Sequence, residues 1–192
     1  SALTKAADVY KDRVRCVLIH TGQHYSDEMS KVFFNEFKMP VPLANLEVGS
    51  GDRITQTHLI MERLEEHLKT IKPDLVVVVG DVNSSIAATL ASVRFGIPVA
   101  HVEAGLRSRN WQMPEEINRV MTDHLSSLLF TTEPQATENI RSEGLDMSKV
   151  HFTGNVMIDT MNQFEAMAEK SDVLERLNLT PYNYVLSTLH RP

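Results

Sequence analysis

The feature that most constrains the fold is an apolar run over 75–79 that ends at Gly80-Asp81. An unbroken apolar run of this length is typical of a parallel strand covered on both faces. A helix rich in alanine and serine is expected over 84–95, and a second apolar strand over 97–102. Strand, helix and strand in this order predict two parallel strands joined by a crossover helix.

The same alternation continues along the chain. Further strands are expected over 14–19, 128–131, 150–153 and 184–188, and further helices over 2–12, 26–37, 52–71, 114–124, 134–144, 156–169 and 171–178. Residues 43–51 lack periodicity and are expected to form a loop. The pattern predicts an α/β protein with a doubly wound, Rossmann-like parallel sheet.

Charge and cysteine content exclude several classes of protein. The net charge of −6 argues against general nucleic-acid binding. A single cysteine, Cys16, cannot form a disulfide within the chain, which fits a reducing compartment. Neither a membrane-spanning apolar run nor a signal-peptide pattern is present in this sequence. We therefore expect a cytoplasmic protein that binds neither membranes nor nucleic acid.

Charged side chains gather where the expected strands end. Asp81 follows one strand and Glu103 ends the next, while Glu115 and Arg119 lie on the helix that begins at Pro114. Ligands of open α/β sheets bind at the carboxyl ends of the strands. Carboxylates beside an arginine at this edge indicate proton transfer on an anionic substrate.

Each of these residues also has a purely structural interpretation. Asp81 or Asn83 could cap the following helix, and Glu103 could pair with Arg107. The helix dipole alone would explain one acidic residue in the first turn at Pro114.

Other ligand classes have no sequence signature. The histidines and the cysteine do not cluster as zinc ligands, and both the dinucleotide and the P-loop fingerprints are absent. We therefore expect neither a metal nor a redox cofactor.

Six motifs, in order and at the appropriate spacing, resemble the non-hydrolysing UDP-N-acetylglucosamine 2-epimerases. They are Thr21-Gly22-Gln23-His24, Gly80-Asp81-Val82-Asn83-Ser84, H-V-E-A-G-L-R at 101–107, P-E-E-I-N-R at 114–119, Thr153-Gly154-Asn155 and His190-Arg191-Pro192. The two longest of these, at 101–107 and 114–119, form a highly specific pair.

The resemblance implies a fold, a reaction and a set of site residues. The fold would be the N-terminal half of a GT-B-type two-domain enzyme, with the active site between the domains. The enzyme would interconvert UDP-GlcNAc and UDP-ManNAc by C2 deprotonation, elimination of UDP and re-addition, for use in cell-envelope polysaccharides. The catalytic residues would be Asp81, Glu103, Glu115 and His190, with Arg119 as a substrate contact and Gln23 and His24 in an allosteric site.

The resemblance also predicts how this chain departs from the family pattern. Residues 1–170 would form the sugar-side domain without its first strand, and 171–192 would begin the inter-domain segment. Without that central strand, two strands should have unpaired edges. We expect the chain alone to be inactive, and the full-length protein to be a homodimer. A non-catalytic module, a hydrolysing epimerase, an epimerase for another UDP-sugar and a GT-B glycosyltransferase are the alternatives.

Overall fold

The computed structural model describes residues 6–7, 9–23, 34, 37 and 39–188. It divides into two compact units, Ser1–Val156 and Met157–Pro192, and each is described by itself. The domain boundary expected after residue 170 remains a prediction.

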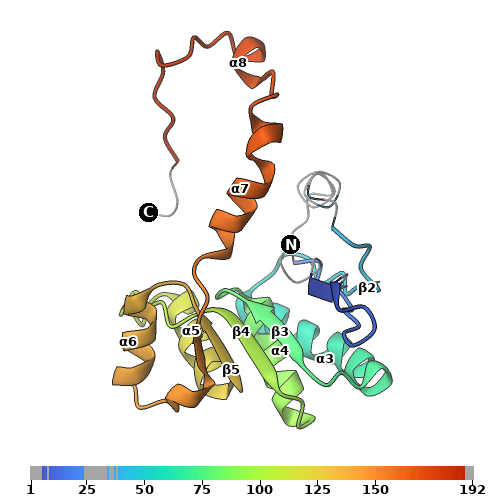
Figure 1. The fold of residues 1–192 in the computed structure, drawn as a ribbon. Coiled ribbons are helices and arrows are strands. Elements are labelled where there is room, and N and C mark those ends of the chain that lie inside the picture. Colours follow the sequence, from blue (N-terminus) through green and yellow to red (C-terminus); the bar gives the residue numbers. More distant parts are fainter. Residues whose placement is uncertain (1–5, 8, 24–33, 35–36, 38, 189–192) are drawn as a thin grey trace. The chain divides into compact units, whose positions relative to one another are not determined.

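Parallel strands form the centre of the first unit (Figure 1). Four of them pair in the order β3-β4-β5-β6, and a separate two-stranded sheet pairs β1 with β2. Their bounds are β1 Ile19–His20, β2 Ala44–Asn45, β3 Val76–Val79, β4 Val99–Ala104, β5 Leu128–Thr131 and β6 Val150–Phe152. Parallel pairing of successive strands confirms the expected α/β architecture.

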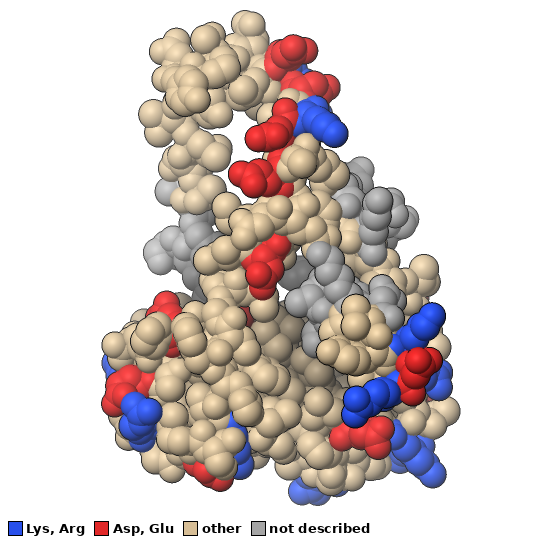
Figure 2. All heavy atoms as spheres, in the orientation of Figure 1, with Lys and Arg blue, Asp and Glu red and all other residues tan. Residues whose placement is uncertain are grey.

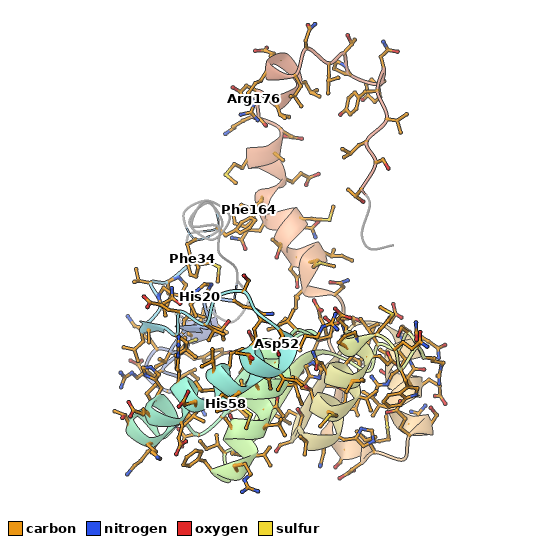
Figure 3. The ribbon with its side chains drawn as sticks, turned by 180° about the vertical axis from the view of Figure 1, so that it is seen from behind. His20, Phe34, Asp52, His58, Phe164 and Arg176 are labelled. Carbon is orange, nitrogen blue, oxygen red and sulfur yellow. The ribbon has the colours of Figure 1, made fainter. Side chains whose placement is uncertain are left out.

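Helices connect these strands. They are α3 Arg53–Ile71, α4 Asn83–Arg94, α5 Pro114–Leu125 and α6 Pro134–Ser142, and a short 3₁₀ helix η1, Met147–Lys149, precedes β6. Figure 3, seen from behind, shows α3 and α4 in front of the sheet, with Asp52 at the start of α3. The Asp52 carboxylate caps α3 by accepting hydrogen bonds from the backbone N–H groups of Ile54 and Thr55, both at 3.0 Å.

The core lies between α3, α4 and the strands. Residues four apart on α3, namely Gln56, Ile60, Leu64 and Leu68, form its buried row. Ile60, Leu64 and Leu68 pack with small residues of α4 such as Ala87 and Ala91. The small side chains of α4 thus allow close helix packing, as the sequence predicts. Ile54, in the first turn of α3, is 83% exposed.

The opposite face of the sheet differs from expectation at β3. Val77 and Val79 are 37% and 48% exposed, although a parallel strand covered on both faces was predicted. Figure 2, in the orientation of Figure 1, shows most charged side chains of the first unit towards its left and right margins. The reason is that α3 and α4 pack together on the other side of the sheet, so half of the valine run has no described helix over it.

Four strands have one open edge in the described part of the chain. β1 and β2 pair only with each other, while β3 and β6 lie at the two ends of the larger sheet. The expectation that a central strand of the family pattern would pair with two of these edges stays a prediction.

The N-terminal strands are the least well predicted elements. The strand expected over 14–19 pairs only at Ile19–His20, and its partner β2 lies in the segment expected to be a loop. A two-residue strand is too short to show alternation, so its sequence carries no periodic signal. Most of the helices expected over 2–12 and 26–37 lie outside the described residues.

The second unit contains the helices α7, Val156–Ala168, which starts at the unit boundary, and α8, Val173–Arg176. The strand expected over 184–188 is wrong, because these residues are irregular. A strand needs a neighbour to pair with, and the described part of this unit offers none. Across the described chain, no helix combines the length and the apolar character needed to cross a membrane.

Gly105, directly after β4, is expected to tolerate no side chain. Its φ is +82°, and a Cβ atom there would lie 2.3 Å from the carbonyl oxygen of Ala136 on α6. We expect Gly105→Ala to lower the free energy of unfolding by roughly 2–4 kcal/mol, from backbone strain plus overpacking. Urea unfolding of the longest soluble protein carrying this sequence measures the change.

Gly144→Ala is the matched control for that experiment. Gly144 has a similar φ of +75° but no atom within 4 Å of the added Cβ, so the control carries the strain without the clash. Equal destabilisation by the two substitutions would show that the close approach to α6 is unimportant.

Candidate functional site

The register of two strands brings the candidate residues together. Val79 on β3 pairs with Val102 on β4, and the Gly80 N–H continues the ladder to the Val102 carbonyl oxygen at 3.0 Å. Asp81 and Glu103 therefore lie at the carboxyl ends of two neighbouring strands, on the same edge of the sheet. The Glu103 Oε2 atom lies 3.4 Å from where a Cβ on Gly80 would be.

Glu103 occupies a strained backbone position. The register between β4 and β5 shifts between Val102 and Ala104, so that Glu103 is an extra residue in its strand, and its φ is +66°. Residues other than glycine rarely adopt this conformation, and such strain clusters at active sites. A bulge re-aims a side chain. Here it belongs to the candidate catalytic carboxylate.

Arg119 on α5 joins the two strand ends. Its guanidinium Nη2 donates to the Asp81 Oδ2 atom at 2.7 Å, and its Nη1 donates to the backbone carbonyl oxygen of Glu103. Arg119 is 8% exposed, whereas the Asp81 side chain is 27% exposed, so water reaches this ion pair mainly from the carboxylate. The arginine thus fixes Asp81 and Glu103 beside one another.

The structure separates the roles of the two acidic residues at the start of α5. Glu116 is 5% exposed and accepts hydrogen bonds from the backbone N–H groups of Ser108 and Arg109, at 2.7 and 3.0 Å. Glu116 therefore holds the loop after β4 against the start of α5. Glu115 is half-buried in the same first turn, one helical turn before Arg119, and remains the candidate for chemistry.

The structural interpretations of Asp81 and Glu103 are wrong. The N-cap of α4 is Val82, so neither Asp81 nor Asn83 caps that helix. Arg107 does not pair with Glu103. It forms a bidentate pair with Glu143, with both N–O distances at 2.7 Å, and donates to Asp123 at 2.7 Å.

Buried charges lie directly beneath the site. The side chains of His101 and Asp123 are fully buried, and Arg107 is 2% exposed. Burial by itself would lower the pKa of Arg107, but hydrogen bonds to Glu143 and the charge of Asp123 outweigh it and raise that pKa above its usual value. Arg107 is thus a permanent cation within this cluster.

A chain of amide side chains links Gln23 to the site. The Gln56 Oε1 atom accepts from Gln23 Nε2 at 3.4 Å and from Asn83 Nδ2 at 2.8 Å. The Asn118 Nδ2 atom donates to Asn83 Oδ1 at 3.2 Å and to the Asp81 carbonyl oxygen at 2.9 Å. Gln23, expected in an allosteric site, is therefore connected by hydrogen bonds to the backbone of a candidate catalytic residue.

Five residues of this arrangement were not predicted as site residues from the sequence. Asn83 and Asn118 belong to the motifs but carried no assigned role. Gln56, at 7% exposed, was a detectable signal, because a buried amide in an apolar helix row needs partners. The partnership of His101 with Asp123, 22 residues apart, leaves no local pattern in the sequence.

Two predicted site residues, His24 and His190, lie outside the described residues. In the described part of the chain no three His, Cys, Asp or Glu side chains gather as a metal site would require. A shallow depression of about 530 Å³ lies beside the site, between α3 and α5, and is partly lined by Asn83 and Asn118.

A family profile and individual relatives match this chain over most of its length. Residues 8–192 match the sequence profile of the family described as UDP-N-acetylglucosamine 2-epimerase. A homologue of that enzyme from Methanococcus maripaludis is 47% identical over 91% of this chain, which spans 49% of the relative. A UDP-2,3-diacetamido-2,3-dideoxy-D-glucuronate 2-epimerase from Pseudomonas aeruginosa is 37% identical over the same share, again spanning 49% of the relative.

A solved structure shows the same fold. The crystal structure of Methanocaldococcus jannaschii UDP-GlcNAc 2-epimerase, in complex with UDP-GlcNAc and UDP, superposes with a TM-score of 0.85 at 43% identity. The match covers 90% of this chain and 47% of that one. The chain thus spans about half the length of the relatives it matches.

Proposed function

Because this chain belongs to the UDP-N-acetylglucosamine 2-epimerase family, we propose that it supplies the sugar-side half of an enzyme that interconverts UDP-GlcNAc and UDP-ManNAc. The observation that carries the proposal is the convergence of Asp81, Glu103 and Arg119 at the ends of two strands. The crystal structure of the relative with UDP-GlcNAc and UDP supports a nucleotide-sugar ligand.

The geometry suits acid–base chemistry at a sugar carbon. Inversion at C2 needs one group that removes a proton from one face and another that returns a proton to the other face. Asp81 in the turn after β3, Glu103 on β4 and Glu115 on α5 supply carboxylates around the edge of the sheet. His190 completes the proposed catalytic set.

The leaving group requires separate binding. In this reaction UDP departs from C1, and the unsaturated sugar waits until UDP adds back. The two phosphates need cationic or N–H donors. In this chain Arg119 is committed to Asp81 and Glu103, and Arg107 to Asp123 and Glu143. We therefore place most of the diphosphate contacts in the part of the family sequence that lies beyond this chain.

Solvent isotope incorporation tests the reaction. In D₂O, the active full-length protein that carries this chain is expected to place deuterium at C2 of UDP-ManNAc, because the proton returned by a carboxylate exchanges with solvent. NMR of the product measures the label. Incubation without enzyme is the control, and a product that keeps its C2 hydrogen throughout would contradict exchange at the proposed carboxylates.

A second candidate is an epimerase for a different UDP-sugar. The observation that favours it is the 37% identity to the UDP-2,3-diacetamido-2,3-dideoxy-D-glucuronate 2-epimerase. Both substrates would undergo the same C2 chemistry, so the carboxylates do not discriminate between them. Comparison of kcat/KM for the two UDP-sugars would decide, and a preference for the diacetamido-uronate would replace the first assignment.

A further inference from the structure

The buried pair of His101 and Asp123 has a hydrogen-bond pattern that fixes its proton count. His101 Nε2 lies 2.9 Å from the Gly80 carbonyl oxygen, and Nδ1 lies 2.6 Å from Asp123 Oδ1. A carbonyl oxygen only accepts hydrogen bonds, so Nε2 must carry a proton. The protonation of the whole pair then depends on the short Nδ1 to Oδ1 contact.

The other contacts of Asp123 favour its ionised form. Its Oδ2 atom accepts from the Gly105 backbone N–H at 3.0 Å and from Arg107 Nη1 at 2.7 Å. A carboxylate that accepts from a backbone N–H group and from a guanidinium is stabilised as an anion. The proton between the pair is therefore assigned to His101 Nδ1, which makes the histidine a cation.

Asp123 reaches both candidate catalytic strand ends through this arrangement. Through His101 it holds the carbonyl of Gly80, the residue before Asp81, and directly it holds the N–H of Gly105, two residues after Glu103. Arg119 lies one turn earlier on α5 and donates to the Asp81 carboxylate and to the Glu103 carbonyl oxygen. Two residues of α5, Arg119 and Asp123, thus hold the strand ends that carry Asp81 and Glu103.

We propose that His101 is a buried imidazolium that, together with Asp123, acts as a positioning pair for the carboxylates of Asp81 and Glu103. The pair touches backbone next to these residues and not the substrate. The positional part of this inference rests on the proposed epimerase function, whereas the protonation state of His101 does not.

NMR of the full-length protein with ¹⁵N-labelled histidine tests the protonation state. At about pH 8 an ordinary histidine is mostly neutral. We expect His101, assigned by the loss of its signals in His101→Gln, to show protons on both ring nitrogens under these conditions. The exposed neighbour His124 serves as the internal reference for the ring-nitrogen signals. A neutral ring at position 101 would overturn the proposal.

Kinetics of Asp123→Asn test the positioning role. The amide keeps the shape of the side chain but removes the charge that holds the second proton on His101. We expect kcat to fall roughly 10- to 100-fold, since small misplacement of reacting groups costs about this much. KM should change less than about threefold, because no substrate contact is removed.

The matched control is His124→Asn, which changes a titratable side chain next to Asp123 but outside the cluster, and it should leave kcat unchanged. A wild-type kcat in Asp123→Asn would overturn the positioning role, as would a loss confined to KM. If the protein turned over neither UDP-sugar, the proposed function would fail, while the NMR result would still decide the state of His101.

Discussion

Replacement of Glu103 by glutamine in the full-length protein is expected to lower kcat by about two or more orders of magnitude. Glutamine keeps the size of the side chain but cannot transfer a proton, and general acid–base groups typically contribute 10²- to 10⁴-fold. Asp81→Asn and Glu115→Gln should have effects of similar size. Steady-state rates of UDP-ManNAc formation measure all three.

The control for these variants is Glu62→Gln on α3, a carboxylate whose side chain is 62% exposed. It should retain the wild-type kcat. Glu116→Gln offers a sharper contrast, because that buried carboxylate holds backbone N–H groups of the loop after β4, so its replacement should lower thermal stability as well as activity. Near-wild-type turnover in all three catalytic variants would contradict the assignment.

The fold of the central region was predictable because its signals are local. The valine run of β3, the small residues of α4 and the proline at the start of α5 each indicate one element, and these elements formed within one or two residues of the expected bounds. The parallel sheet then follows from their order.

The N-terminal strands and the uncovered valines were less predictable for a physical reason. Whether Ile19–His20 pairs, or whether Val77 is covered, depends on which segments lie beside it in space. A strand propensity states only that a residue suits a sheet, and tertiary context decides the rest.

The site shows the same division. The sequence placed Asp81, Glu103 and Arg119 at one edge, because carboxyl ends of parallel strands share an edge. It could not show that Glu103 lies in a bulge with φ +66°, since this position has no glycine that would indicate a left-handed backbone conformation. The residue pattern alone did not separate Glu115 from Glu116, and only the family resemblance named Glu115. The loop whose backbone N–H groups bind Glu116 is positioned only in three dimensions.

The 192-residue chain on its own is expected to show no measurable epimerase activity. Epimerisation requires UDP to be held until it adds back, and the described arginines closest to the carboxylates are already paired within the site. Each missing charged contact to a diphosphate costs roughly 1.5–3 kcal/mol, and 1.4 kcal/mol corresponds to a tenfold loss of affinity. Several missing contacts would remove most of the useful binding.

The open strand edges lead to a second expected property of the isolated chain. β1 and β3 each expose unpaired backbone groups in the described structure, and such edges pair with other molecules. We expect self-association that grows with concentration, measured by sedimentation velocity, whereas a protein of full family length serves as the active control. A monomeric 192-residue chain that unfolds cooperatively and converts UDP-GlcNAc to UDP-ManNAc would contradict both expectations. It would mean that the residues around Asp81 and Glu103 hold the whole nucleotide sugar without a second domain.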